Sequence, residues 1–266
     1  MAAGVVEFRE PLVQGSVAKL VVSEVDEHSL VRGSWQGKPL GFYPLGPGKY
    51  GSLIGVDLGL PPGKYPLKIR VETGGKTTML WQEDIQVVKK FYGIERLQLP
   101  ERMVKLDSRT LKRVRREQQV FRQLWNKWTP ERYWTGSFLK PVNGKLLSPF
   151  GRRRIINNEP RSPHSGIDLR ARQGEPVMAA NRGRVVLVGD YFFPGRSVVI
   201  DHGQGLFTMY FHLSKVKVQQ GSMVERGTVI GLAGASGRAS GPHLHWGVRL
   251  DGARVNPVEL LEATGS

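Results

Sequence analysis

Glycine and proline interrupt the chain so often that they limit which elements it can form. The 266 residues include 33 glycines and 17 prolines. The apolar runs between them, such as "SVAKLVV", "GRVVLVGD" and "TVIGLAG", are short and rich in β-branched residues. Long helices are destabilised by this spacing, whereas short strands joined by tight turns make use of it. The sequence therefore predicts a mainly β protein.

Residues 1–95 are predicted to form a small β-sandwich of the immunoglobulin-like type. Leu67, Ile69 and Val71 alternate with polar neighbours, which is the period of a strand with one buried face. "ETGGK" then marks a hairpin turn that leads into "TTMLWQEDIQVV". Several such strands in one segment favour two antiparallel sheets packed face to face. We assign no chemistry to this accessory domain.

Residues 96–133 are predicted to be a linker that carries a basic amphipathic helix. Apolar side chains recur there at three- and four-residue spacing, which predicts one helix between Glu101 and Pro130. These side chains are Leu111, Val114, Phe121, Leu124, Trp125 and Trp128. Asp107 or Ser108 can cap the start of the helix, and Pro130 marks its end. We interpret the segment as a connecting helix that docks on a neighbouring domain.

The formal net charge of +16 indicates an anionic partner or surface. Nucleic acid, anionic lipid and an acidic wall polymer all fit such a charge. The chain has no aromatic RNA-binding motif, zinc finger or helix-turn-helix pattern, so we expect no nucleic-acid partner. An acidic polymer would contact the linker helix through Lys112, Arg113, Arg115 and Arg116. A purely solvated basic surface is the alternative.

Targeting signals are not visible in the sequence. No apolar run approaches the roughly 18–20 residues of a membrane span, so we expect no transmembrane segment. The start, "MAAGVVEFREPLVQGS", lacks the basic and apolar regions of a signal peptide, although a signal removed from the mature protein would leave the same start. The absence of cysteine excludes disulfides and thiolate metal sites, and it fits either the cytosol or an exported protein.

Residues 134–266 are predicted to form a second β domain, an antiparallel sheet or barrel-sandwich. Two of its segments resemble each other, "QGEPVMAANRGRVVLVGD" and "QGSMVERGTVIGLAGAS". Each offers a glycine, an apolar strand, a glycine turn and another strand. This quasi-repeat predicts paired hairpins, in which Gln173 and Gln220 occupy corresponding turns.

Five of the six histidines lie in this second β domain. Because side chains alternate across a strand, His243 and His245 of "HLHWGV" should point the same way. His164 and Asp168 of "HSGIDL" are also an even number of residues apart, so they can converge on one face. Two short motifs therefore each place a pair of polar side chains on one side of a strand.

A third strand, "TMYFHL", carries His212, which alternation places on the same face as Tyr210. If the three strands are neighbours, one polar face gathers four histidines and one aspartate. His202 differs because it follows Asp201 at a strand end, and we interpret it as a structural histidine.

This set of side chains exceeds what one metal ion needs. Catalytic zinc takes three protein ligands from histidine, aspartate and glutamate and keeps the fourth position for water. Without cysteine, two histidines and one aspartate are the natural ligand set. Two histidines would remain beside the metal to handle protons. The residues by themselves leave open which histidine has which role.

Several motifs occur in order between about residues 134 and 257: "SPFGRRR", "HSGIDL", "GEPVMAANRGRVV", "YFHLS" and "SGRASGPHLHWGV". They resemble the LytM/lysostaphin family of zinc endopeptidases, which cleave peptidoglycan cross-bridges. The resemblance implies one Zn²⁺ per chain, bound by His164, Asp168 and His245. It also implies that His212 and His243 are the catalytic pair.

The resemblance implies a metalloendopeptidase that hydrolyses peptide cross-links of peptidoglycan in cell-wall remodelling. The motif variants and the separate sandwich favour a D,D-endopeptidase acting on D-Ala–diaminopimelate bridges in the periplasm, with glycyl-glycine bridges as the alternative substrate. A non-enzymatic peptidoglycan-binding module, or an activator of other wall hydrolases, is the second class of function. Relatives of that class have lost their metal ligands, whereas every ligand is intact here.

One loop departs from the family pattern. Some members use a tyrosine from the loop before the first histidine ligand to stabilise the transition state. Here that loop reads "RIINNEPRSP" and contains no tyrosine. We expect Asn157, Asn158 or an arginine to supply any such donor.

Overall fold

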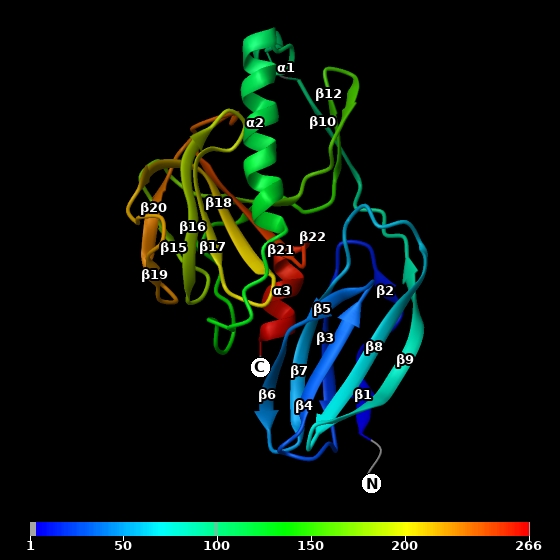
Figure 1. Ribbon diagram of the computed structural model, residues 1–266. Helices are drawn as coiled ribbons and strands as arrows, with labels where there is room; N and C mark the ends of the chain where they lie inside the picture. Colours follow the sequence, from blue (N-terminus) through cyan, green and yellow to red (C-terminus); the bar gives the residue numbers. More distant parts are fainter. Residues whose placement is uncertain (1–3, 99, 266) are drawn as a thin grey trace.

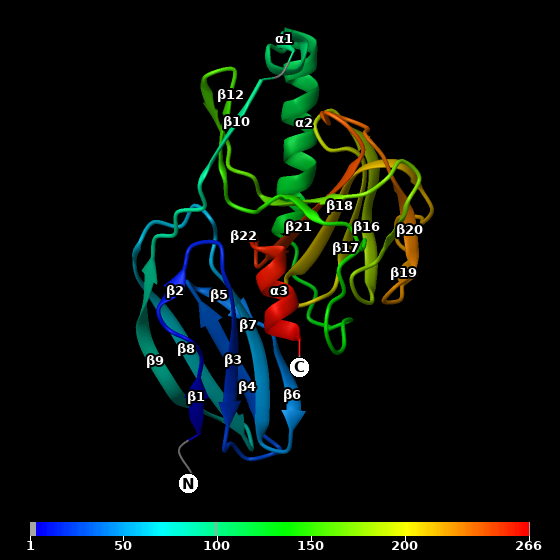
Figure 2. The same ribbon diagram turned by 180° about the vertical axis from the view of Figure 1, so that it is seen from behind.

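The computed structural model describes residues 4–98 and 100–265. The chain forms an N-terminal β-sandwich and a larger C-terminal β lobe, joined by a segment that contains a long helix (Figure 1; Figure 2). Strands dominate both lobes, so the prediction of a mainly β protein with a connecting helix is confirmed. Among the described residues, no helix is both long enough and apolar enough to cross a membrane.

The sandwich consists of two sheets that share one apolar core. The first sheet has the order β1 (Val5–Glu7), β3 (Val17–Ser23), β7 (Lys49–Gly55) and β6 (Phe42–Gly46). The second has the order β2 (Leu12–Val13), β9 (Lys76–Val88), β8 (Gly63–Thr73), β4 (Leu30–Trp35) and β5 (Lys38–Leu40). Side chains from both sheets are buried between them, among them Leu20, Val22, Ile54, Trp35, Leu67, Ile69 and Val87.

The C-terminal lobe is built on a ten-stranded antiparallel sheet. Its main path is β11 (Leu146–Ser148), β14 (Gly166–Arg170), β21 (His243–Leu250), β18 (Leu206–Val216), β17 (Gly195–Asp201), β16 (Gly183–Tyr191) and β19 (Met223–Val224). Three more strands pair at its margins, β15 (Pro176–Met178), β20 (Val229–Ala233) and β22 (Ala253–Val255). The sheet therefore places the three histidine-bearing segments next to one another.

The two similar segments exchange strands instead of forming two separate hairpins. β15 of the first segment pairs with β20 of the second, and β16 of the first pairs with β19 of the second. The expected hairpins do not form because the chain between β15 and β16 passes through the core, where Ala179 and Ala180 are fully buried. The corresponding turn glycines, Gly174 and Gly221, both have positive φ (83° and 93°), which glycine adopts without strain.

The connecting segment forms two helices where the sequence predicts one. α1 (Glu101–Val104) is a single turn, and α2 (Ser108–Trp125) is the long helix of Figure 1. Asp107 separates them as the N-cap of α2, since its Oδ1 accepts a hydrogen bond from the backbone N–H of Thr110 at 2.7 Å. The predicted cap is therefore correct, but α2 ends before Pro130.

One part of the apolar stripe anchors α2 on the C-terminal lobe. Val114 and Leu124 are buried, whereas Leu111 is 41% exposed and Trp128 lies beyond the end of the helix. Leu124 belongs to a small core that α2 shares with strands β16, β17 and β18, together with Leu187, Val199, Phe207 and Met209. The expected docking of the helix on a neighbouring domain is confirmed, with a shorter stripe than the sequence predicts.

A strand of the connecting segment also ties it to the C-terminal lobe. β10 (Ile94–Leu97) runs parallel to β12 (Arg153–Ile156), and β13 (Glu159–Arg161) completes a three-stranded sheet. This small sheet stands above the sandwich beside α2 (Figure 2). The chain that leaves the sandwich therefore reaches the C-terminal lobe before either helix begins.

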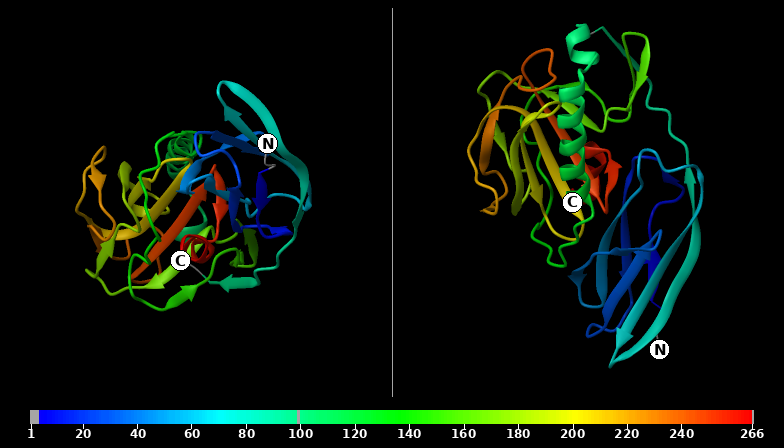
Figure 3. Two further views of the ribbon diagram at one scale, coloured as in Figure 1. Left: turned by 90° about the horizontal axis from the view of Figure 1, so that it is seen from below. Right: turned by 45° about the horizontal axis from the view of Figure 1, so that its top comes forward.

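Polar contacts fasten the two lobes together. The guanidinium of Arg254 donates hydrogen bonds to both carboxylate oxygens of Asp57, at 2.6 and 3.0 Å. Glu259 in α3 (Pro257–Thr264) accepts hydrogen bonds from Lys90 Nζ at 3.2 Å and from the backbone N–H of Val17 at 3.2 Å. α3 lies at the junction of the two lobes (Figure 3). The sandwich is thus packed against the C-terminal lobe as well as linked to it.

We expect Leu124→Ala to destabilise the C-terminal lobe by about 2–5 kcal/mol, because truncating a buried leucine leaves a cavity. Val120→Ala, a change on the exposed side of the same helix, should alter the free energy of unfolding by less than about 0.5 kcal/mol. Chemical denaturation of the two variants measures the difference. Equal effects would contradict the docking of α2 through Leu124.

Candidate metal centre

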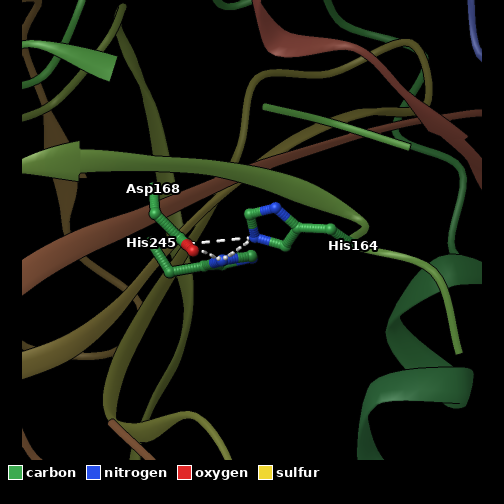
Figure 4. A group of neighbouring side chains, drawn as sticks. All are labelled: His164, Asp168 and His245. Atoms are coloured by element: carbon green, nitrogen blue, oxygen red, sulfur yellow. Dashed lines mark hydrogen bonds and ion pairs between the residues drawn. The ribbon is translucent and has the colours of Figure 1, made fainter. Parts of the chain in front are cut away.

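Three side chains converge where β14 meets β21 (Figure 4). Asp168 and His245 are direct partners in the register of these antiparallel strands, so their side chains share one face. His164 precedes β14 and is held by its own backbone, which donates to the carbonyl of Arg152 at 3.0 Å and accepts from the N–H of Gly151 at 2.8 Å. The structure thus brings together the three side chains that the family resemblance names.

The converging atoms are His164 Nε2, His245 Nδ1 and Asp168 Oδ1. His164 Nε2 lies 3.0 Å from each of the other two atoms, which are 2.8 Å apart. His164 Nδ1 lies 3.0 Å from the carbonyl oxygen of Pro149, which can only accept, so Nδ1 carries the proton and Nε2 presents its lone pair. Three electron-pair donors that face one another in this way suit a shared metal cation.

The electrostatics of the cluster favour an ionised carboxylate. Burial opposes the charge of Asp168, yet the imidazoles of His164 and His245 beside it hold its pKa well below the ordinary range. Burial is also the main reason that the pKa of His245 is lowered, which keeps that imidazole neutral. A carboxylate and neutral imidazoles are the protonation states in which these groups bind metals.

Gly166 permits the close approach of the two strands at this point. A Cβ atom at Gly166 would lie 2.5 Å from the carbonyl oxygen of Trp246 and 2.7 Å from His245 Nε2. Both distances are shorter than real Cβ contacts, so any side chain here would push His245 away from Asp168. The glycine of "HSGIDL" is therefore a requirement of the cluster.

A second layer of polar groups orients the cluster. Arg154 donates to Asp168 Oδ2 at 3.4 Å and to Glu95 Oε2 at 2.9 Å. Ser148 Oγ donates to Glu95 Oε1 at 2.8 Å and lies 3.3 Å from His164 Nδ1. Glu95 belongs to β10, so the strand that leaves the sandwich contributes directly to the surroundings of the cluster.

His212 reaches the cluster through a β-bulge. Phe211 and His212 stand opposite Ser197 alone, because the register of β17 and β18 shifts by one residue there. His212 has a φ of 63°, in the left-handed region that is unusual for a residue with a side chain. The expected common face with Tyr210 is wrong. The Tyr210 side chain is fully buried in the core, whereas the bulge turns the His212 side chain toward His243 and His245.

His212 and His243 form a pair beside the cluster, with ring centroids 4.7 Å apart. His212 Nδ1 donates to the carbonyl of Ser236 at 2.8 Å, and His243 Nδ1 donates to that of Gly241 at 2.9 Å. Both histidines therefore keep Nε2 as the free proton acceptor. Burial, and then the neighbouring histidines, lower the pKa of His212 to about 3, so His212 is neutral at pH 7.

His202 lies elsewhere and is a structural residue, as expected. It is fully buried, and its ring nitrogens are engaged by the carbonyl of Arg182 at 2.8 Å and by Thr208 Oγ1 at 2.7 Å. Burial lowers the pKa of His202 to about 4, which keeps the ring neutral.

A cavity of about 400 Å³ opens over the cluster and is lined by His164 and His245. The connecting segment supplies one apolar wall through Val104, Leu106 and Leu111. Three arginines, Arg154, Arg161 and Arg238, give the cavity a basic lining. Arg154 and Arg161 belong to the loop before His164, so this lining agrees with the expectation that an arginine of that loop supplies a donor. Asn157 and Asn158 instead form the turn between β12 and β13, with φ of 51° and 65°.

Sequence reasoning missed two parts of this cavity. Arg238 lies inside the motif "SGRASGPHLHWGV", but its side chain carries no signal of its own in a chain with many arginines. No sequence signal places the connecting segment at the site, because only the fold brings Val104, Leu106 and Leu111 into the same cavity as His164.

The comparisons with known proteins agree on one family of peptidases. Residues 162–257 match the family model "Peptidase family M23". The chain is 41% identical over 123 residues to the DD-carboxypeptidase/endopeptidase Mpg of Neisseria meningitidis, which covers 46% of this chain and 28% of the relative. It is 40% identical over 122 residues to the peptidoglycan DD-endopeptidase ShyA of Vibrio cholerae, with coverages of 45% and 28%. The matched part is thus about a quarter of these relatives' own length.

A solved structure from Pseudomonas aeruginosa, described as a peptidase M23, resembles nearly the whole chain. Its identity is 36%, the alignment covers 96% of each chain, and the TM-score is 0.72. The likeness therefore includes the sandwich and the connecting segment as well as the C-terminal lobe.

The cluster predicts which histidines are needed to hold a metal. His245→Ala removes one of three converging ligand atoms, so the variant should lose bound divalent metal and the thermal stability that the metal adds. His212→Ala and His243→Ala leave the cluster complete and should each retain metal. Metal analysis after dialysis, together with melting curves, decides this. Loss of metal in His243→Ala with retention in His245→Ala would reverse the assignment.

Proposed function

Because the chain belongs to peptidase family M23, we propose that it is a zinc metalloendopeptidase that hydrolyses peptide cross-links of peptidoglycan. The observation that carries this proposal is the convergence of His164 Nε2, His245 Nδ1 and Asp168 Oδ1 beside two uncommitted histidines. Residues 134–266 would form the endopeptidase domain, residues 96–133 the linker and residues 1–95 an accessory domain.

Zinc suits this set of donors better than other common metals do. Two imidazole nitrogens and one carboxylate oxygen are a frequent catalytic zinc set, which leaves a further position for water. His164, Asp168 and His245 would hold the ion, one per chain. When bound, zinc supplies Lewis acidity and lowers the pKa of water to about 7.

His212 and His243 would move the protons of the reaction. Each has its Nδ1–H tied to a backbone carbonyl, so Nε2 is free to accept a proton from the attacking water and to return it to the leaving amine. The low pKa of His212 keeps it in the accepting form at neutral pH. The partner histidine, once protonated or as an N–H donor, would stabilise the oxyanion.

We propose D-Ala–diaminopimelate cross-links as the substrate and the periplasm as the compartment. The names of the relatives Mpg and ShyA, DD-carboxypeptidase/endopeptidase and peptidoglycan DD-endopeptidase, support this choice over glycyl-glycine bridges. The complete metal cluster argues against a non-enzymatic binding module or an activator of other hydrolases.

The basic side of α2 is proposed to contact the anionic wall polymer. Lys112, Arg115 and Arg116 are exposed and have no acidic partner among the described residues. Arg113 differs from them, because it donates to Glu117 Oε1 at 2.6 Å and to the carbonyl of Asp190 at 3.1 Å. The polymer contact would therefore involve three of the four basic residues expected from the sequence.

Digestion of purified, directly cross-linked sacculi tests the enzymatic function. We expect conversion of cross-linked dimers to monomers in muropeptide analysis, loss of this conversion with a chelator, and recovery on adding Zn²⁺. His212→Ala and His243→Ala should lose about 10²–10⁴-fold in rate, since each removes a positioned acid–base group. Unchanged muropeptides with tight pelleting on sacculi would favour the binding module instead, and full activity of His212→Ala would remove that residue from the mechanism.

Replacing Lys112, Arg115 and Arg116 together with glutamine should weaken sacculus binding at low salt. The difference should shrink above about 0.1 M salt, where exposed charges are screened. Pelleting assays across a salt series measure it. A matched control replaces three exposed basic residues of the sandwich, Lys64, Arg70 and Lys76. Equal weakening by both triple variants would mean that only net charge matters.

A further inference from the structure

Arg238 is the one arginine of the cavity that the described residues leave without an acidic partner. Arg154 is neutralised by Glu95 and Asp168, and Arg161 pairs with Glu159. The guanidinium of Arg238 instead lies over the ring of Phe193, 4.1 Å from its centroid. Arg238 lines the same cavity as His164 and His245, so an unneutralised cation stands beside the metal centre.

Interlocked loops fix the position of Arg238. Its backbone N–H donates to the carbonyl of Phe193 at 2.9 Å, which joins the loop before β21 to the loop before β17. Gly237 has a φ of 71°, and a Cβ there would lie 2.3 Å from the backbone nitrogen of Gly195. The carbonyl of Ser236, in the same loop, accepts a hydrogen bond from His212 Nδ1–H. Arg238 and His212 are therefore held by one rigid unit.

A cation in this setting favours an anion. Partial burial and the neighbouring Arg154 and Arg161 lower the pKa of Arg238, so its charge is held against an electrostatic cost. A carboxylate would offset that cost, because a guanidinium can donate two parallel hydrogen bonds to it. The side chain of Arg238 makes no hydrogen bond to another described residue, so its N–H groups are available for such a contact while its carbon lies over the Phe193 ring.

We propose that Arg238 binds a substrate carboxylate next to the scissile amide and so selects direct cross-links over glycyl bridges. This inference rests on the proposed peptidase function and names the group that the site recognises. In a D-Ala–diaminopimelate bridge, the carbon attached to the scissile nitrogen also bears a free carboxylate. In a glycyl-glycine bridge, the corresponding position bears only the next peptide carbonyl. Arg238 is thus a specificity-determining residue of the cavity.

Two soluble cross-linked muropeptide dimers test this proposal with the zinc-loaded full chain. One carries the free diaminopimelate carboxylate beside the scissile bond, and in the other this carboxylate is amidated. We expect the unchanged protein to prefer the free carboxylate by about 10–100-fold in kcat/KM, as for a hydrogen bond to a charged group. Arg238→Met should abolish this preference by slowing cleavage of the free-carboxylate dimer, while cleavage of the amidated dimer changes little.

Two further variants sharpen the result. Arg238→Lys keeps the charge without the bidentate geometry and should retain part of the preference. Arg172→Met removes an exposed arginine of the same lobe outside the cavity and should leave the preference unchanged. Equal cleavage of both dimers by the unchanged protein, or a full preference in Arg238→Met, would overturn the proposal.

Binding separates this inference from the proposed function. Calorimetric titration of the zinc-loaded protein with each dimer should give tighter binding of the free carboxylate, and Arg238→Met should remove the difference. If neither dimer is cleaved but this pattern holds, the peptidase proposal fails and the carboxylate site stands. If both dimers are cleaved but bind equally in every variant, the carboxylate site fails and the peptidase proposal stands.

Discussion

The unshared electron pairs of His164, His245 and Asp168 face one another at 2.8–3.0 Å, and much of the C-terminal lobe serves this one arrangement. Two imidazole nitrogens and a carboxylate oxygen that converge in this way suit a shared cation. The β14–β21 register, Gly166 at the crossing and the Pro149 carbonyl that fixes the His164 tautomer all keep them together. Backbone and second-layer contacts therefore hold the three candidate ligand atoms in one arrangement.

The bulge at His212 converts a ligand cluster into a site that can handle protons. It places a neutral imidazole beside His243 and ties its Nδ1 to the carbonyl of Ser236. The same loop carries Arg238, so the proposed proton acceptor and the proposed carboxylate-binding residue share one support. Backbone hydrogen bonds to the carbonyls of Phe193 and Pro194 therefore set the position of Arg238 relative to His212.

The N-terminal half of the chain is coupled to the site at two points. Glu95 in β10 holds Arg154 and Ser148, which in turn contact Asp168 and His164. Val104, Leu106 and Leu111 form an apolar wall of the cavity, so the connecting segment borders the site directly. The placement of this segment thus helps to set the shape of the cavity of about 400 Å³ over the cluster.

The sequence by itself determined the features that depend on local geometry. Spacing of glycine and proline gave the β class, and two-residue alternation placed His243 with His245, because both follow from one strand's own backbone. Tertiary structure decided the rest. Alternation alone would turn His212 away from His245, and only pairing with β17 and the 2.9 Å hydrogen bond from His212 N–H to the Pro194 carbonyl produce the bulge that brings it back. Strand exchange between the repeats and the arrival of Arg238 beside the metal centre likewise rest on contacts between distant segments, which no local pattern encodes.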